Sequence, residues 1–107
     1  MRQAGDSSLE ALLQAARAEF GRSLAEKMAE LEAMIAQGEW QGARRAAHKL
    51  CGSAGIYGFG ALGCAAAALE EILIASESDP DVGARANIRA KLDEMYTEAN
   101  RAALETR

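Results

Sequence analysis

The sequence predicts an all-α fold, an antiparallel four-helix bundle whose N-terminal helix is either kinked or preceded by a short extra helix. Apolar residues recur every three to four positions along most of the chain. No segment alternates apolar and polar residues as a half-buried strand does, and the connections between the periodic segments are short. Aromatic residues make up only 5% of a chain that is 50% hydrophobic and rich in alanine, which is typical of closely packed helices.

The N-terminal helix is predicted to begin near Ser8. Ser7 and Glu10 have the spacing of a capping box, in which two side chains satisfy the free backbone amides at a helix start. Gly21 indicates a break or a kink, and Gly38 a left-handed cap at the end of the second periodic run. The apolar positions of these two runs are Leu9, Leu12, Leu13, Ala16 and Phe20, and then Leu24, Met28, Leu31 and Ile35.

Three further helical segments follow. One restarts at Glu39 and enters a glycine-rich passage over 55–63, and the next ends in the polar run 76–80. Asp79 is predicted to be the N-cap of the last helix, with Pro80 in its first turn, where the missing amide hydrogen costs nothing. The predicted core residues are Ala43, Ala47, Leu50, Ala54, Leu62, Leu69, Leu73, Leu92 and Tyr96.

Length and charge limit the classes of protein to consider. Residues 1–107 fit a single domain, because a chain of this size can bury about two-thirds of its unfolded surface in one core. A net charge of −4 gives no reason to expect binding to nucleic acid or to an anionic membrane. No signal peptide or apolar run of membrane-spanning length is present, and Cys51 and Cys64 indicate free thiols in a reducing compartment, so we expect a cytoplasmic protein.

Basic residues gather around the single histidine, His48. No acidic residue occurs between Trp40 and Leu69. On a helical wheel the imidazole points about 120° away from the centre of the apolar arc of its helix, toward solvent. Its neighbours on the wheel are Gln41, Arg44, Arg45, Gly52 and Gly55, and Lys49 follows it in the chain.

An exposed imidazole in this setting suits phosphoryl transfer. Imidazole is a nucleophile that is neutral in much of the population near physiological pH. Guanidinium groups near it favour an anionic phosphohistidine and attract an acidic partner site. Gly52 costs roughly 1 kcal/mol relative to alanine in a helix, and its place on the polar side suggests that it leaves room for a partner rather than for a packed helix.

The run from Ala47 to Ala54, Ala-His-Lys-Leu-Cys-Gly-Ser-Ala, followed by Gly58, Leu62 and the pair Leu69-Glu70, resembles the histidine phosphotransfer (HPt) domain family. The family pattern is approximately Ala-His-x-Leu-Lys-Gly-Ser-Ala, with a glycine, a leucine and a Leu-Glu pair further along. The resemblance covers residues 40–73 closely, and it agrees with a four-helix bundle.

The resemblance implies that His48 is the phosphoacceptor, that Gly52 is the small residue beside it and that Ser53 is the next position along. It implies a domain without kinase activity or a cofactor of its own, whose receiver partner supplies magnesium and catalysis. Cys51 departs from the pattern, because the family usually has a lysine there and a thiol supplies no charge. Arg44 lies only about 40° from His48 on the wheel, and we expect it to take over the screening of the phosphate.

Other motifs are set aside. The run from Gly58 to Gly63 matches the dinucleotide fingerprint, but that fingerprint needs a preceding strand and the segment before it is helical. Cys51, Cys64 and His48 do not have the spacing of a structural zinc site, and both cysteines suit a helix interface instead. A haem site would require an inward-facing histidine. We therefore expect no metal ligands and no cofactor.

The resemblance, together with the exposed His48, therefore implies a phosphorelay intermediate of two-component signal transduction. His48 would accept a phosphoryl group from a receiver-domain aspartate and pass it to the aspartate of a response regulator. The expected partners are receiver domains of response regulators and hybrid histidine kinases, bound by a monomer, and the partner-binding or phosphate-screening residues are Gln41, Arg44, Arg45, Lys49, Gly52, Ser53 and Gly55. The alternatives are a non-phosphorylated adaptor or inhibitor that binds a receiver or kinase, and a ligand-binding bundle.

Overall fold

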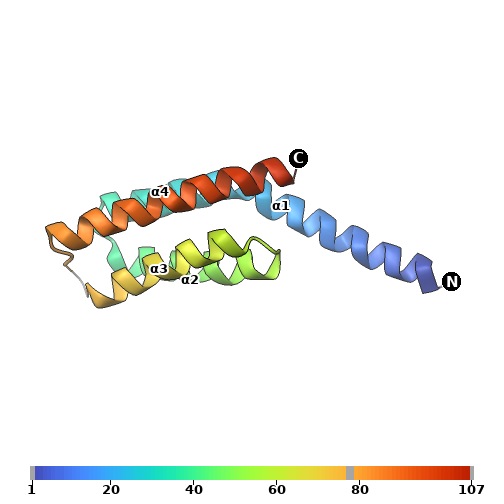
Figure 1. The fold of residues 1–107 in the computed structure, drawn as a ribbon, viewed down its shortest axis with the longest axis horizontal. Coiled ribbons are helices and arrows are strands. Elements are labelled where there is room, and N and C mark those ends of the chain that lie inside the picture. Colours follow the sequence, from blue (N-terminus) through green and yellow to red (C-terminus); the bar gives the residue numbers. More distant parts are fainter. Residues whose placement is uncertain (1, 77–78, 107) are drawn as a thin grey trace.

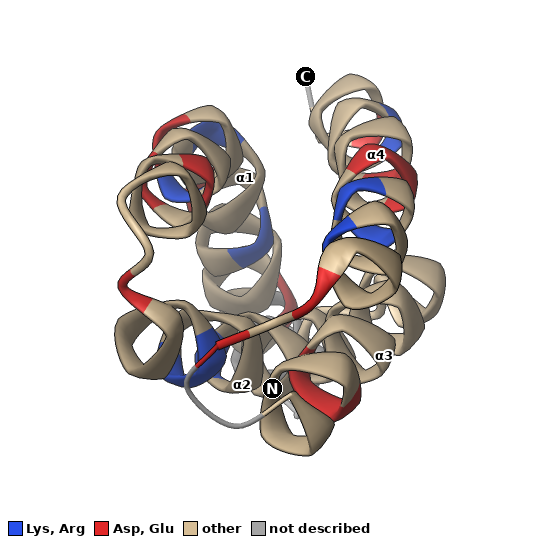
Figure 2. Ribbon diagram, turned by 90° about the vertical axis from the view of Figure 1, so that its left-hand side faces the viewer, with Lys and Arg blue, Asp and Glu red and all other residues tan. Residues whose placement is uncertain are grey.

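Four helices make up the fold in the computed structural model, which describes residues 2–76 and 79–106, with side chains from Ser8 onward. They are α1 (Arg2–Ala36), α2 (Trp40–Ile56), α3 (Gly60–Ala75) and α4 (Val82–Glu105), with no strand in the described ranges. The helices alternate in direction, and each packs against two neighbours around a square (Figures 1 and 2). The predicted all-α, antiparallel four-helix bundle is confirmed.

Two glycines with positive φ end the first two helices. Gly38 has φ 73°, and the following amide of Glu39 donates to the carbonyl of Met34, which ends α1. Gly58 has φ 83° between α2 and α3. Left-handed backbone is readily available only to residues such as glycine, so the predicted cap at Gly38 is confirmed.

The core lies between the helices and contains no buried polar residue among the described ones. Eight of the nine predicted core residues are buried, and Tyr96 is half-buried, with its hydroxyl donating to the Glu32 carboxylate. Tyr96 departs from the prediction because a phenol needs a polar partner for its hydroxyl. The buried apolar residues are Phe20, Leu24, Met28, Leu31, Ala43, Ala47, Leu50, Ala54, Phe59, Leu62, Ala66, Leu69, Leu73, Ile88, Leu92, Met95, Ala99 and Ala102.

The predictions for the N-terminal helix were wrong in two respects. Helix α1 begins at Arg2 rather than near Ser8, and the side chain of Ser7 lies outside the described side chains. Nor does Gly21 break α1, which is one continuous helix through that position. Gly21 is buried, and a Cβ atom there would collide with Oγ1 of Thr106. The glycine therefore serves close packing of α1 against the end of α4.

The start of α4 also differs from the prediction. Asp81, not Asp79, is the N-cap: its backbone is extended, and its Oδ1 accepts a hydrogen bond of 2.8 Å from the amide of Ala84. Pro80 precedes the cap, and its carbonyl accepts from Nε of Arg85. Both aspartates suit a cap by residue type, but among the described residues only the Asp81 side chain accepts a backbone amide of α4, and the buried Pro80 lies before the helix.

Helix α1 extends past the end of the bundle where α2 meets α3 (Figure 1). The leucines of its first apolar run, Leu9, Leu12 and Leu13, are exposed there. At the same end Phe59 is buried and stacks on Phe20, with ring centroids 5.8 Å apart. Phe59 therefore caps the core at this end of the bundle.

Candidate functional site

Helix α2 presents His48 to solvent. Its residues Ala43, Ala47, Leu50 and Ala54 are buried against the other helices. This apolar arc fixes the rotation of the helix about its axis, because burying it is the main gain on packing. The His48 side chain is consequently 73% exposed, as the helical wheel predicts.

A carboxylate from the neighbouring helix holds the imidazole. Nδ1 of His48 lies 3.0 Å from Oε2 of Glu70 on α3. The Glu70 side chain is only 18% exposed, and it follows the fully buried Leu69. An ionised carboxylate can only accept hydrogen bonds, so in the neutral imidazole the proton sits on Nδ1 and the lone pair on Nε2. The pair therefore favours the tautomer that leaves the lone pair of Nε2 free and facing away from Glu70.

Small residues at the interface between α2 and α3 bring this pair together. A Cβ atom on the buried Gly63 would lie 3.4 Å from the carbonyl oxygen of Cys51 and 3.7 Å from Cβ of Ala54. Ala54 and Ala66 are completely buried. Backbones that approach this closely place a side chain as long as glutamate within reach of the histidine on the facing helix.

Four lysine and arginine side chains on or near α2 differ from the others in their ion pairing. Six other lysines and arginines, Arg17, Arg22, Arg85, Arg89, Lys91 and Arg101, each form a salt bridge. Lys27, Arg44, Arg45 and Lys49 form none with the described part of the chain. Helix α2 also carries no acidic residue (Figure 2). Its positive charge is thus available to an anion or to an acidic partner.

The surface beside His48 is open at two glycines. Gly52 and Gly55 are exposed, and a Cβ atom on either would meet nothing within 4 Å. Packing inside the described chain therefore does not explain why Gly52 lies in the middle of a helix. Absence of a side chain leaves room for another protein to approach the imidazole.

The remaining predicted site residues divide between two places. Gln41 is exposed on α2, whereas Arg45, Lys49 and Ser53 line a groove between α1 and α2. Arg44 is half-buried and does not line this groove. Cys51 is half-buried against the core, in agreement with its predicted place at a helix interface, but Cys64 is exposed on α3, so that prediction was wrong for Cys64.

Glu70 was not predicted as a site residue. Its only signal in the sequence was the Leu-Glu pair of the family pattern, which says nothing of proximity to His48, 22 residues earlier. The helical period places Glu70 beside the buried Leu69, but it does not say which residue of another helix the carboxylate meets.

Three alternative sites, for a dinucleotide, a metal ion and a haem group, find no support in the geometry. The passage from Gly58 to Gly63 joins two helices and includes the start of α3, so the dinucleotide fingerprint lacks its strand. Within residues 2–76 and 79–106 no three histidine, cysteine, aspartate or glutamate side chains cluster as metal ligands would. His48 points outward, which does not suit an axial ligand in a bundle core.

The fold and the site define a class: an antiparallel helical bundle that displays one carboxylate-held histidine on its outer surface rather than in a pocket. The Hpt domain model matches residues 8–102, and the chain belongs to the Hpt domain family. This family consists of phosphotransfer modules that act with receiver domains in the phosphorelays of two-component signalling. No curated protein and no solved structure is significantly similar to the chain. None of its described helices is long and apolar enough to cross a membrane.

Proposed function

We propose that His48 is the phosphoacceptor of a phosphorelay intermediate, taking a phosphoryl group from a receiver aspartate and passing it to the aspartate of a response regulator. The observation that carries the proposal is the contact of 3.0 Å between Nδ1 of His48 and the Glu70 carboxylate on an otherwise exposed imidazole. In this proposal residues 1–107 act as one domain and as a monomer.

The transfer step uses the free lone pair of the histidine. Nε2 attacks the phosphorus of the aspartyl phosphate in line with the bond that breaks, and a nitrogen–phosphorus bond forms. The bond between phosphorus and the aspartate oxygen breaks, and the aspartate leaves as a carboxylate with the electron pair. The ring becomes more positive as Nε2 attacks, and the Glu70 carboxylate stabilises that charge through the Nδ1 proton.

The surroundings of His48 suit a partner rather than a small substrate. The imidazole is 73% exposed, and Gly52 and Gly55 leave the adjacent surface without side chains. Arg44, half-buried one turn before His48, is proposed to screen the phosphate in place of the family's lysine, because Cys51 offers no charge there.

Phosphotransfer from a panel of phosphorylated receiver domains tests this function. The wild-type chain should acquire a label that is stable to base and labile to acid, and His48→Gln should acquire none. Reverse transfer from the labelled chain to unphosphorylated receivers then identifies the downstream regulator. Binding of a receiver without transfer to the wild-type chain would contradict the proposal and favour the non-phosphorylated adaptor, for which the missing lysine at Cys51 is the specific argument.

A further inference from the structure

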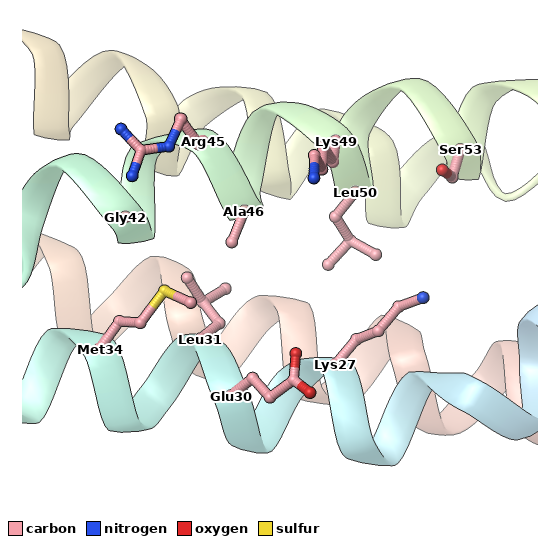
Figure 3. A pocket seen from close by; sticks show the side chains of 10 residues that line it. All are labelled: Lys27, Glu30, Leu31, Met34, Gly42, Arg45, Ala46, Lys49, Leu50 and Ser53. Atoms are coloured by element: carbon pink, nitrogen blue, oxygen red, sulfur yellow. The ribbon is translucent and has the colours of Figure 1, made fainter.

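A groove of about 390 Å³ lies between α1 and α2 (Figure 3), and its lining includes Arg45 and Lys49, which lie close to His48 in the chain. Leu31 and Met34 on α1 and Leu50 on α2 point into it from opposite sides and form its apolar floor. Lys27, Arg45 and Lys49 lie around it together with one carboxylate, that of Glu30.

Two small residues of α2 shape this groove. A Cβ atom on Gly42 would lie 3.3 Å from Sδ of Met34, so glycine allows α1 and α2 to approach there. Ala46, one turn further along, is half-buried and has no side chain beyond its methyl group to fill the space. The groove therefore offers room for an apolar side chain from another molecule.

The charge around the groove is unbalanced. Its three cations face one carboxylate, and none of the three forms a salt bridge with the described residues. A groove of similar volume, about 370 Å³, lies between α3 and α4, but its Lys91 is paired with Glu94 and its Glu98 with Arg101. In a chain of net charge −4, the α1–α2 groove is thus a positive site that the fold itself leaves unneutralised.

We propose that the α1–α2 groove is the docking site for the partner receiver domain, a proposal that rests on the proposed function. One apolar side chain of the receiver enters the groove over Leu31, Met34 and Leu50, and carboxylates next to it bind Lys27 and Arg45. Arg45 lies one turn before His48 and Lys49 directly after it. A receiver that brings its aspartate to the imidazole therefore covers this rim as well. Such a contact would set affinity and partner choice, whereas Glu70 acts on the transfer step.

Phosphotransfer kinetics with the fastest receiver of the panel test this docking site. The variants are Lys27→Glu, which reverses a rim charge, and Ala46→Leu, which fills the groove. Each has a matched control in the α3–α4 groove, Lys91→Glu and Ala65→Leu respectively. The rate of His48 phosphorylation is measured against receiver concentration, and circular dichroism and thermal unfolding confirm that each variant folds.

Docking predicts a change in the concentration dependence. Both groove variants should raise the half-saturating receiver concentration by about tenfold and leave the saturating rate within about twofold. The control variants should match the wild type, and Lys27→Glu should also weaken the salt dependence of the apparent affinity. Because Lys27 is exposed, its variant carries the test even if Ala46→Leu does not fold.

Failure of the docking site and failure of the proposed function would give different results. If the wild-type chain is phosphorylated and Lys27→Glu has the same half-saturating concentration as Lys91→Glu, the docking site is wrong and the function of His48 stands. If no receiver phosphorylates the wild-type chain, the proposed function fails first. A groove variant that lowers only the saturating rate would also overturn the proposal, because the groove would then act on transfer rather than on docking.

Discussion

Glu32 and Glu70 each connect two neighbouring helices of this bundle, and their surroundings differ. Glu32 on α1 accepts from both Tyr96 and Arg89 on α4, and Arg89 also binds Asp93. Among the described residues, Glu70 on α3 forms a side-chain hydrogen bond or ion pair only with His48 on α2, while the nearby cations remain unpaired. The first cluster is satisfied within the chain and connects two helices. The second leaves a nitrogen and several positive charges available, as expected of a site completed by a partner.

The pKa values of the first cluster are consistent with its structural role. Hydrogen bonds from Tyr96 and then Arg89 hold the pKa of the Glu32 carboxyl below its ordinary value. The same contacts raise the pKa of Tyr96, chiefly through the hydrogen bond to Glu32, and that of Arg89. Each group thus keeps the protonation state that the contact needs over the neutral range.

Replacing Glu70 should have the largest effect on transfer. In Glu70→Gln the amide can donate to Nδ1, which would move the ring proton to Nε2 and block the nucleophile. We expect the saturating rate of phosphorylation to fall by at least about tenfold, as in other sites where an acid sets a histidine tautomer. Nitrogen NMR of the His48 ring should show the altered tautomer, and Glu70→Asp should restore part of the rate. An unchanged rate and tautomer would make the contact merely structural.

Two of the helical glycines, Gly52 and Gly21, should respond to substitution in opposite ways. Gly52→Ala should stabilise the fold by about 0.5–1 kcal/mol, because alanine is the better helix former and no atom is in the way. Gly52→Leu should keep that stability yet slow transfer several-fold, by roughly 1 kcal/mol in the barrier, by obstructing the partner. Gly21→Ala should destabilise the chain, because its Cβ would meet Thr106. Urea unfolding and transfer rates measure both effects; fast transfer to Gly52→Leu would show that the open surface is not used.

Loss of the Glu32 cluster should affect stability alone. Glu32→Gln should lower the free energy of unfolding by about 1 kcal/mol at pH 7, since the contacts are partly exposed. Because the folded-state pKa is lowered, this stabilisation is present above the ordinary value of 4.5 and is lost as pH falls through the lowered value. Urea unfolding should therefore show a difference between wild type and variant that shrinks below pH 4.5. A change in the rate of phosphotransfer would show that Glu32, like Glu70, affects transfer and is not purely structural.

Arg44→Ala should have the smallest effect. An exposed charge contact contributes about 0.2–1 kcal/mol, so the lifetime of phosphohistidine should shorten by no more than about fivefold. Arg22→Ala, which removes an arginine paired with Glu19 on α1, is the control and should leave the lifetime unchanged. Equal lifetimes for both variants and the wild type would show that Arg44 does not screen the phosphate.

The sequence predicted best where neighbours within one or two helical turns decide the outcome. The apolar arc of α2 and the outward direction of His48 follow from the helical period alone, as does the left-handed turn at Gly38 from its residue type. The first residue of α4 was harder to predict from the sequence, because Asp79 and Asp81 suit an N-cap equally well by residue type.

By itself, the sequence determined the helical class, the buried face of each bundle helix and the exposure of the single histidine, since these depend on local periodicity and hydrophobic burial. Only the tertiary structure placed Glu70 against Nδ1 of His48, Gly21 against Thr106, and Lys27 across a groove from Arg45. These contacts join residues 18 to 85 positions apart. They depend on how far one helix is rotated and shifted against the next, which the packing of residues such as Gly63, Ala54 and Ala66 sets.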